Sequence, residues 1–329
     1  IYGAGPSGSP HIFDQTIDHG FTTLLLEPNT GSETKSRDGS LKHDLPRNSQ
    51  NTPLIGDPRN DENLVLSQMQ VAFIKFHNNL VTKLKAEGLT NPVEIFLEAQ
   101  RLTRWHYQWI ILHEFLPKTV GQALVDDILQ NGRKFYQWNN APYIPVEFSV
   151  AAYRFGHSQV RPSYRVNFGT NNTTQIFALF FNDNLTNPVT IDMRGGSRAP
   201  ERFIDWQTFF DFGDGNVRNN KRIDTKISTV MFDLPGMPAS EPQSLAQRNL
   251  LRHLTFKVPS GQRVAAAMGI PALLESDLAD LKPFNLHNRT PLWFYVLREA
   301  DVKADAKRLG PVGGRIVGEV MIGLLQGDN

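Results

Sequence analysis

Two long helical patterns that follow one another constrain the fold of this chain more than any other feature. Apolar residues recur every three or four positions over residues 65–80 and again over residues 95–113, as they do along one face of an α-helix. The first pattern predicts a helix that ends near Gly88, and the second predicts a helix over residues 93–115 that is stopped by Pro117. Two long neighbouring helices indicate a mainly α-helical core.

The remaining segments alternate short helical patterns with loops. Residues 1–58 have Gly, Pro, Asn, Asp and Ser throughout and predict an irregular segment. Residues 165–200 are polar and predict only short strands, near residues 176–181 and 189–193. Further helices are expected over residues 121–131, 146–156, 199–213, 245–254, 260–268 and 291–301, and at the end of the chain from residue 313. We therefore expect a mainly α fold with long irregular loops and few short strands, in which residues 59–329 form the helical core of a single domain over residues 1–329.

Composition excludes several classes of protein. The chain has 34 basic and 33 acidic residues, so no overall charge attracts it to nucleic acid or to an anionic membrane. It has no cysteine, which excludes disulfides, thiolate metal sites and Fe–S clusters. No apolar run reaches the length of about 18 residues that a transmembrane helix needs. Any metal must be held by histidine, a carboxylate or a cofactor, and the compartment stays open, with a secreted location compatible with the sequence.

Two motifs resemble known ligand-binding sites, but the neighbouring residues that such sites need are missing. "GAGPSG" (3–8) has the glycine spacing of a dinucleotide-binding loop, but no buried strand precedes it and no helical pattern follows it. "DFGDGN" (211–216) has two aspartates beside glycines, but it lacks the alternating ligands and the distal glutamate of an EF-hand. We interpret the second motif as a helix end followed by a tight turn.

The nine histidines do not form a metal triad. His106 and His113 lie seven residues apart on one helical face, and because that face is apolar we expect hydrogen-bonded core histidines there. His77 is interpreted as structural as well. His157 differs, because it directly follows "RFG", where the glycine leaves room for a large planar group near the backbone. A lone histidine after glycine is nevertheless more often structural.

An arginine at the start of the first long helix needs an explanation. In "GDPRNDEN" (56–63), Asn60 and Asp61 are the expected helix caps. The first turn of a helix carries about half a positive charge, which favours acidic residues and disfavours Arg59. Helix electrostatics alone therefore give no reason for Arg59.

Taken together, "GDPRNDEN", "YRFGH" and "LAQRNLLR" in this order resemble the animal-type haem peroxidase superfamily, the myeloperoxidase- and lactoperoxidase-like group, and most closely its bacterial branch. The resemblance extends over nearly the whole chain through these stretches: "IYGAGPSGSP", "DLPRN", "FHNNLV", "RLTRWHYQWIILHEFLP", "VPSGQ", "TPLWFYVL" and "RLGPVGGRIVGEV". It implies the haem peroxidase helical fold, a haem b cofactor, and oxidation of a halide or small organic reductant by hydrogen peroxide.

The resemblance also implies roles for individual residues. Arg59 is similar to the distal arginine that polarises peroxide and stabilises the departing hydroxide. His157 is similar to the proximal ligand of the haem iron. Glu62, three residues after Arg59, is similar to the glutamate that forms an ester with a haem methyl group.

On the proximal side, Arg154 and Arg248 resemble arginines that meet haem propionates. The asparagine that holds the proximal histidine in the family falls at Leu245, whose side chain cannot accept a hydrogen bond. Asn249 is the nearest substitute.

The amino-terminal part departs from the family pattern. The distal histidine and the calcium loop of the family precede the segment that "IYGAGPSG" resembles, and neither is among these residues. His19 in "IDHGF" is a weak alternative, because it follows that segment. We expect this chain to be the carboxyl-terminal portion of a peroxidase whose distal histidine and calcium site lie upstream of Ile1 or on a separate amino-terminal fragment. Two alternatives stay open: a haem-binding relative without turnover, and a fatty-acid dioxygenase of the same superfamily, although no motif specifies the tyrosine that such an enzyme uses.

Overall fold

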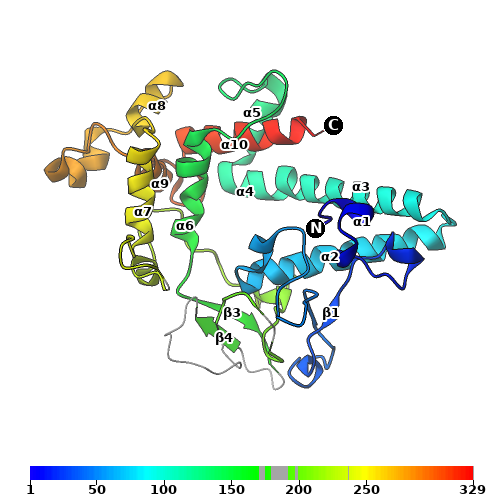
Figure 1. Cartoon of the computed structure of the whole chain (residues 1–329). Helices are drawn as coiled ribbons and strands as arrows, with labels where there is room; N and C mark the ends of the chain where they lie inside the picture. The colour runs from blue at the N-terminus through cyan, green and yellow to red at the C-terminus, as the bar shows by residue number, and fades with distance from the viewer. Residues whose placement is uncertain (170–174, 179–191, 197–198, 236, 329) are drawn as a thin grey trace. The chain divides into compact units, whose positions relative to one another are not determined.

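The computed structural model describes residues 1–169, 175–178, 192–196, 199–235 and 237–328. The chain forms two compact units (Figure 1), of which unit 1 comprises Ile1–Tyr107 with Pro162–Asn219 and unit 2 comprises Gln108–Arg161 with Asn220–Asn329. The expectation of one domain over residues 1–329 stays a prediction. Among the described residues, no helix combines the length and the apolar character that crossing a membrane would require.

Unit 1 is organised around the two predicted long helices, α2 (Leu64–Ala86) and α3 (Pro92–Ile110), which lie side by side in Figure 1. Leu80 and Leu84 of α2 are buried against Ile95 and Ala99 of α3. After α2, Gly88 adopts a φ of +100°, a conformation that L side chains rarely adopt. The predicted end of the first helix is therefore confirmed.

The start of α2 differs from the prediction. Asn63 is its N-cap, and the Asn63 side chain accepts a hydrogen bond from the backbone N–H of Leu66 at 3.0 Å. Residues 58–61 instead form a separate 3₁₀ turn, Pro58–Asp61, which Asp57 caps. The expectation that Asn60 and Asp61 cap the helix was wrong, because the chain pairs with another segment at Asn63 before α2 begins.

Residues 1–58 are largely irregular, as predicted, and are held by side chains buried against the long helices. Phe13, Leu24 and Leu45 form one apolar cluster with Ile74 of α2 and Phe96 of α3. The regular elements here are short: α1 (Gly5–Gly8), the strands β1 (Glu27–Pro28) and β2 (His43–Asp44), and 3₁₀ turns at Pro10–Ile12, Asp18–Gly20 and Ser32–Thr34. The two strands pair in antiparallel fashion.

The second part of unit 1 is a hairpin of β3 (Ser163–Asn167) and β4 (Gln175–Ala178), paired in antiparallel fashion. β4 corresponds to the strand expected near residues 176–181, of which 179–181 lie outside the described residues. The strand expected over residues 189–193 lies largely outside them as well.

The prediction of a helix over residues 199–213 was wrong, because the only helical element of that segment is a 3₁₀ turn at Trp206–Thr208. The segment instead runs beside β3. The Asn167 side chain donates to the carbonyls of Glu201 and Phe203, and the N–H of Asp205 donates to the carbonyl of Val166. These long-range bonds use the backbone groups that a helix would need.

The regular elements described in unit 2 are all helical. Its first helical run contains a π turn (Ile111–Phe115) and then α4 (Leu116–Val120), so Pro117 does not stop the helix as expected. Proline is tolerated there because it occupies the first turn of α4. The run ends at Gly121, whose φ is +94°.

The helices that follow in unit 2 contribute most of the residues of one apolar core that contains Leu292, Tyr295 and Val317. These elements are α5 (Gln122–Asn131), a π turn (Glu147–Ala151), a 3₁₀ turn (Ala152–Phe155), α6 (Gly156–Gln159), a 3₁₀ turn (Thr229–Phe232), α7 (Leu245–Thr255), α8 (Gly261–Ala267), a 3₁₀ helix (Glu275–Phe284), α9 (Leu292–Ala304) and α10 (Pro311–Gln326). The helices predicted near residues 121–131 and after residue 238 are confirmed. The 3₁₀ helix over 275–284 was not predicted.

Candidate functional site

His157 lies on α6, directly after Gly156, and faces α7. Its Nδ1 atom is 2.8 Å from Nδ2 of Asn249, whose side chain is 1% exposed. The other ring nitrogen, Nε2, has no hydrogen-bond partner within the described part of the chain. The structure therefore brings together the two residues that the sequence suggested as a ligand and its holder, and leaves one nitrogen of the histidine available.

The Asn249 amide shows which tautomer suits this pair. Its Oδ1 atom is buried and has no partner among the described residues. Amide nitrogen and oxygen are assigned from hydrogen bonding rather than from shape, and rotating the amide by half a turn places Oδ1 where it accepts a hydrogen bond from Nδ1–H of His157. The lone pair of Nε2 is then free, which is the form of histidine that binds a metal ion. These two residues fit a haem iron ligated by histidine.

The protonation of His157 agrees with this role. Burial, and then the positive charges of Arg154 and Arg252, lower the pKa of His157 to about 4, although its bond to Asn249 acts in the opposite direction. The imidazole is therefore neutral near pH 7.

The positive charges of two arginines near His157 are not balanced by a carboxylate among the described residues. Neither Arg154 nor Arg252 has a carboxylate partner within the described residues, and Nε of Arg154 is buried without a hydrogen bond. Burial and the charge of Arg252 lower the pKa of Arg154. Trp293 fixes the backbone here, since its Nε1 donates to the carbonyl of Arg154 at 3.1 Å. Such a pair of guanidinium groups complements an anion such as the carboxylates of haem.

The α7 arginines differ from the sequence expectation. Arg248, the predicted propionate ligand, pairs with Glu241 at 3.1 Å, and its Nη1 lies 3.3 Å from the sulfur of Met237. Its predicted role stays a prediction. Arg252 was not among the predicted site residues, but its positive charge lowers the pKa of His157. It lies three residues after Asn249, a spacing that places both on one face of the helix. That spacing was the signal available in the sequence.

Arg59 and Glu62 lie in unit 1, on the turn that precedes α2. A buried ion pair fixes this turn, because Arg47 donates to both carboxylate oxygens of Asp61 at 2.8 and 2.9 Å. The backbone is held from the other side, where the N–H of Gly195 donates to the carbonyl of Glu62 at 3.0 Å. Contact is so close that a Cβ atom on Gly195 would lie 1.4 Å from the carbonyl oxygen of Asp61.

The Arg59 side chain itself is 77% exposed and binds Asp57, with Nε–Oδ1 and Nη2–Oδ2 distances of 3.0 and 2.6 Å. This hydrogen-bonded pair raises the pKa of Arg59. Asp57 thus offsets the cation that looked out of place in the sequence. Glu62 is exposed. The structure places Arg59 and Glu62 in one unit and His157, Arg154, Arg248 and Asn249 in the other.

The remaining histidines correct one expectation. His77 is fully buried and bonded at both nitrogens, as a structural histidine should be. His106 and His113 are exposed rather than in the core, because the buried stripe of α3 ends at Thr103. Within the described residues no group of three or more His, Asp or Glu side chains is arranged to hold a metal ion.

The family model for animal haem peroxidase matches residues 17–205, a stretch that includes both Arg59 and His157. The chain belongs to the animal haem peroxidase family. Among relatives, it is 32% identical over 151 residues to a peroxidase-like protein of Margaritifera margaritifera, a match that covers 42% of this chain and 19% of that protein. It is 31% identical over 143 residues to peroxidase mlt-7 of Caenorhabditis elegans, with 43% of this chain and 19% of that protein covered.

These matches span less than a fifth of the relatives' own length, and they come from animals, so they do not confirm a bacterial branch. Among solved structures, peroxidase A from Dictyostelium discoideum is similar, with a TM-score of 0.55 and 19% identity. That similarity covers 86% of this chain and 54% of the Dictyostelium chain. The mainly α-helical fold of a haem peroxidase is therefore confirmed.

Proposed function

We propose that this chain binds haem b through Nε2 of His157 and takes part in the oxidation of a halide or small organic reductant by hydrogen peroxide. The observation that carries the proposal is the His157–Asn249 pair, in which one ring nitrogen meets a buried amide and the other has no partner in the described chain. The haem, when bound, supplies the redox chemistry with peroxide.

The residues of this chain would divide the remaining work. Asn249 holds the His157 ring in the tautomer that leaves Nε2 free, and Arg154 and Arg252 would hold the propionates of a bound haem. Arg59 stabilises the negative charge that develops as the peroxide bond breaks, once its guanidinium leaves Asp57. Glu62 is the candidate for an ester to a haem methyl group.

Proton transfer needs a further group. Arginine stays protonated in proteins, so Arg59 cannot carry a proton between the two peroxide oxygens, work that suits a neutral imidazole. We propose that a histidine outside residues 1–329 supplies it, on a separate segment as the resemblance implies. Peroxide turnover at full rate by a preparation that contains these residues alone would contradict this part of the proposal.

Haem reconstitution of the full chain tests the ligand. The wild-type protein should show a Soret band typical of histidine-ligated haem, and His157→Ala should lose the band or retain haem much more weakly. His113→Ala is the matched control, since His113 is an exposed histidine of the same unit. A His157→Ala variant with the wild-type spectrum would refute the assignment.

A peroxide assay with a chromogenic reductant separates the alternatives. Haem binding together with turnover supports a peroxidase. Haem binding without turnover, even when an amino-terminal segment is supplied, would instead favour a haem-binding relative that is not an enzyme.

A further inference from the structure

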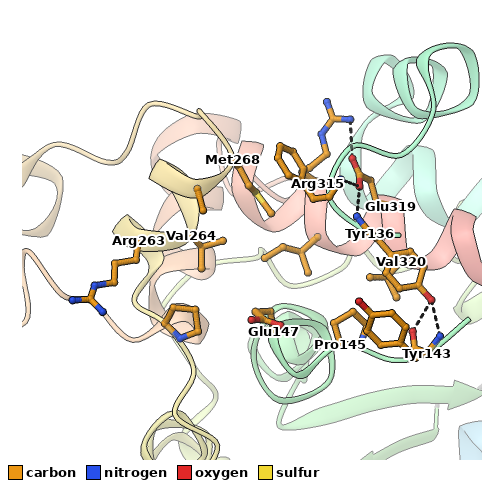
Figure 2. Close-up of a pocket in the computed structure, with 14 residues that line it drawn as sticks. Tyr136, Tyr143, Pro145, Glu147, Arg263, Val264, Met268, Arg315, Glu319 and Val320 are labelled. Atoms are coloured by element: carbon orange, nitrogen blue, oxygen red, sulfur yellow. Dashed lines mark hydrogen bonds and ion pairs between the residues drawn. The ribbon is translucent and has the colours of Figure 1, made fainter. Parts of the chain in front are cut away.

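One cavity in unit 2 is built from residues that the proposed haem chemistry does not use. It has a volume of about 480 Å³, within the usual range for small-molecule sites. Figure 2 shows the side chains around it, which come from the 135–147 segment, α8 and α10. Its apolar walls include Tyr136, Tyr143, Val264, Met268, Ile316 and Val320.

Buried polar contacts fix one side of this cavity. Glu319 on α10 is 1% exposed and accepts hydrogen bonds from the N–H groups of Lys134, Phe135 and Tyr136 at 2.9, 2.7 and 2.9 Å. The hydroxyl of Tyr136 donates to the carbonyl of Tyr143 at 2.6 Å and accepts from its N–H at 3.0 Å. The loop is therefore fastened to α10 without any ligand, so binding would require little ordering.

The charges around the cavity are not all paired. Glu319 is satisfied by the loop and by Arg315, which also pairs with Asp127 at 2.6 Å. Glu147 is half-buried, and its carboxylate has no hydrogen bond or ion pair with any described residue. Arg263 is exposed, and in Figure 2 its guanidinium extends away from the other labelled side chains. Two charges without an ion pair among the described residues therefore line the cavity, and the half-buried one is the carboxylate of Glu147, whereas the Arg263 guanidinium is exposed.

We propose that this cavity binds an organic cation with an apolar body, namely a protonated amine such as an arylalkylamine. The ammonium group forms a charge-assisted hydrogen bond with Glu147. The exposed face of Tyr143 adds a cation–π or stacking contact, and Val264, Met268 and Val320 cover the hydrocarbon part. An anionic ligand is disfavoured by the same carboxylate, and a neutral one gains only the apolar contacts.

The probe for the test is 2-phenylethylammonium, with 2-phenylethanol as the neutral comparison and 3-phenylpropionate as the anionic one. The full chain is labelled with ¹³C at the methionine methyl groups, and the Met268 signal among the six methionines is identified with Met268→Leu. We expect a saturable shift of that signal with the amine, weaker binding of the alcohol, and still weaker binding of the carboxylate.

Glu147→Gln should weaken amine binding by about tenfold, because it removes the negative charge from the hydrogen bond at a site that is partly open to water. The same variant should leave binding of 2-phenylethanol unchanged. Asp301→Asn, which removes an exposed carboxylate of the same unit, is the matched control and should bind the amine like the wild type.

Three results would overturn the proposal: no saturable shift of the Met268 signal, equal affinity for the amine and the alcohol, or an amine affinity that Glu147→Gln does not reduce. If the variant does not fold, the shift of the Met268 signal and the comparison of amine with alcohol on the wild-type chain still test the proposal. His157→Ala should bind the amine normally, so failure here is distinguishable from failure of the haem assignment.

Discussion

Unit 1 should lose stability in mild acid because of His77. This side chain is fully buried, its Nε2 donates to the carbonyl of Thr22 at 2.8 Å, and its Nδ1 accepts from the hydroxyl of Tyr2 at 3.0 Å. Burial lowers the pKa of His77 from 6.5 to about 4. The folded protein therefore excludes a proton that the unfolded chain binds below pH 6.5.

The sign and size of the effect follow from linkage. Because the pKa is lower in the folded state, the stability is complete above pH 6.5 and falls as the pH decreases towards 4. A difference of 2.5 pKa units corresponds to about 3.4 kcal/mol in full, and to about 2 kcal/mol at pH 5.

Hydrogen exchange followed by mass spectrometry on peptides from α2 measures the opening free energy of unit 1 separately from that of unit 2. The wild type should lose about 2 kcal/mol between pH 7.5 and pH 5. His77→Gln cannot bind the proton, so its opening free energy should start lower but change less with pH. His11→Gln, at an exposed histidine of the same unit, should behave like the wild type. Equal pH dependence in wild type and His77→Gln would refute the reasoning.

Three further predictions concern the turn before α2 and the candidate haem site. Asp61→Asn should lower the free energy of unfolding by about 2 kcal/mol in urea titrations, because among the described residues it leaves buried Arg47 with Asp44 as its one remaining counter-charge, whereas Asp57→Asn at an exposed pair should cost much less. Asn249→Leu should weaken haem retention by about 10- to 100-fold, measured as transfer to a haem-acceptor protein, because the ring it holds loses its partner; unchanged retention would contradict the holding role. Acid-acetone should extract all haem from Glu62→Gln after peroxide treatment but leave part of it on the wild type, and complete extraction from both would exclude the ester.

Local patterns were sufficient for some features and insufficient for others. The long helices were predictable because each has a sustained apolar face, and the end of the first was predictable because Gly88 follows it. Residues 199–213 resemble a helix in composition, but their backbone groups bond to β3, a partner that no local pattern reveals. Pro117 was misread because a π turn before it and its place in the first turn of α4 accommodate the ring.

The candidate site shows the same division. His157 could be found from "YRFGH", and the nearest asparagine to the family position proved to lie against it in space. Arg252 was overlooked, although its spacing from Asn249 on one helix was visible. Whether Arg248 meets a propionate cannot be predicted from a motif, since its pairing with Glu241 depends on how the loop before α7 folds.

Gly195 has no side chain that could take part in a reaction, yet substitution of this residue should be strongly damaging. Any side chain at this position would collide with the main chain of Asp61, on the turn that presents Arg59. A substitution there would therefore displace a segment more than 130 residues earlier in the sequence. In a survey of natural variants, a change at Gly195 should be as damaging as a change at Arg59 itself, even though it removes no functional group.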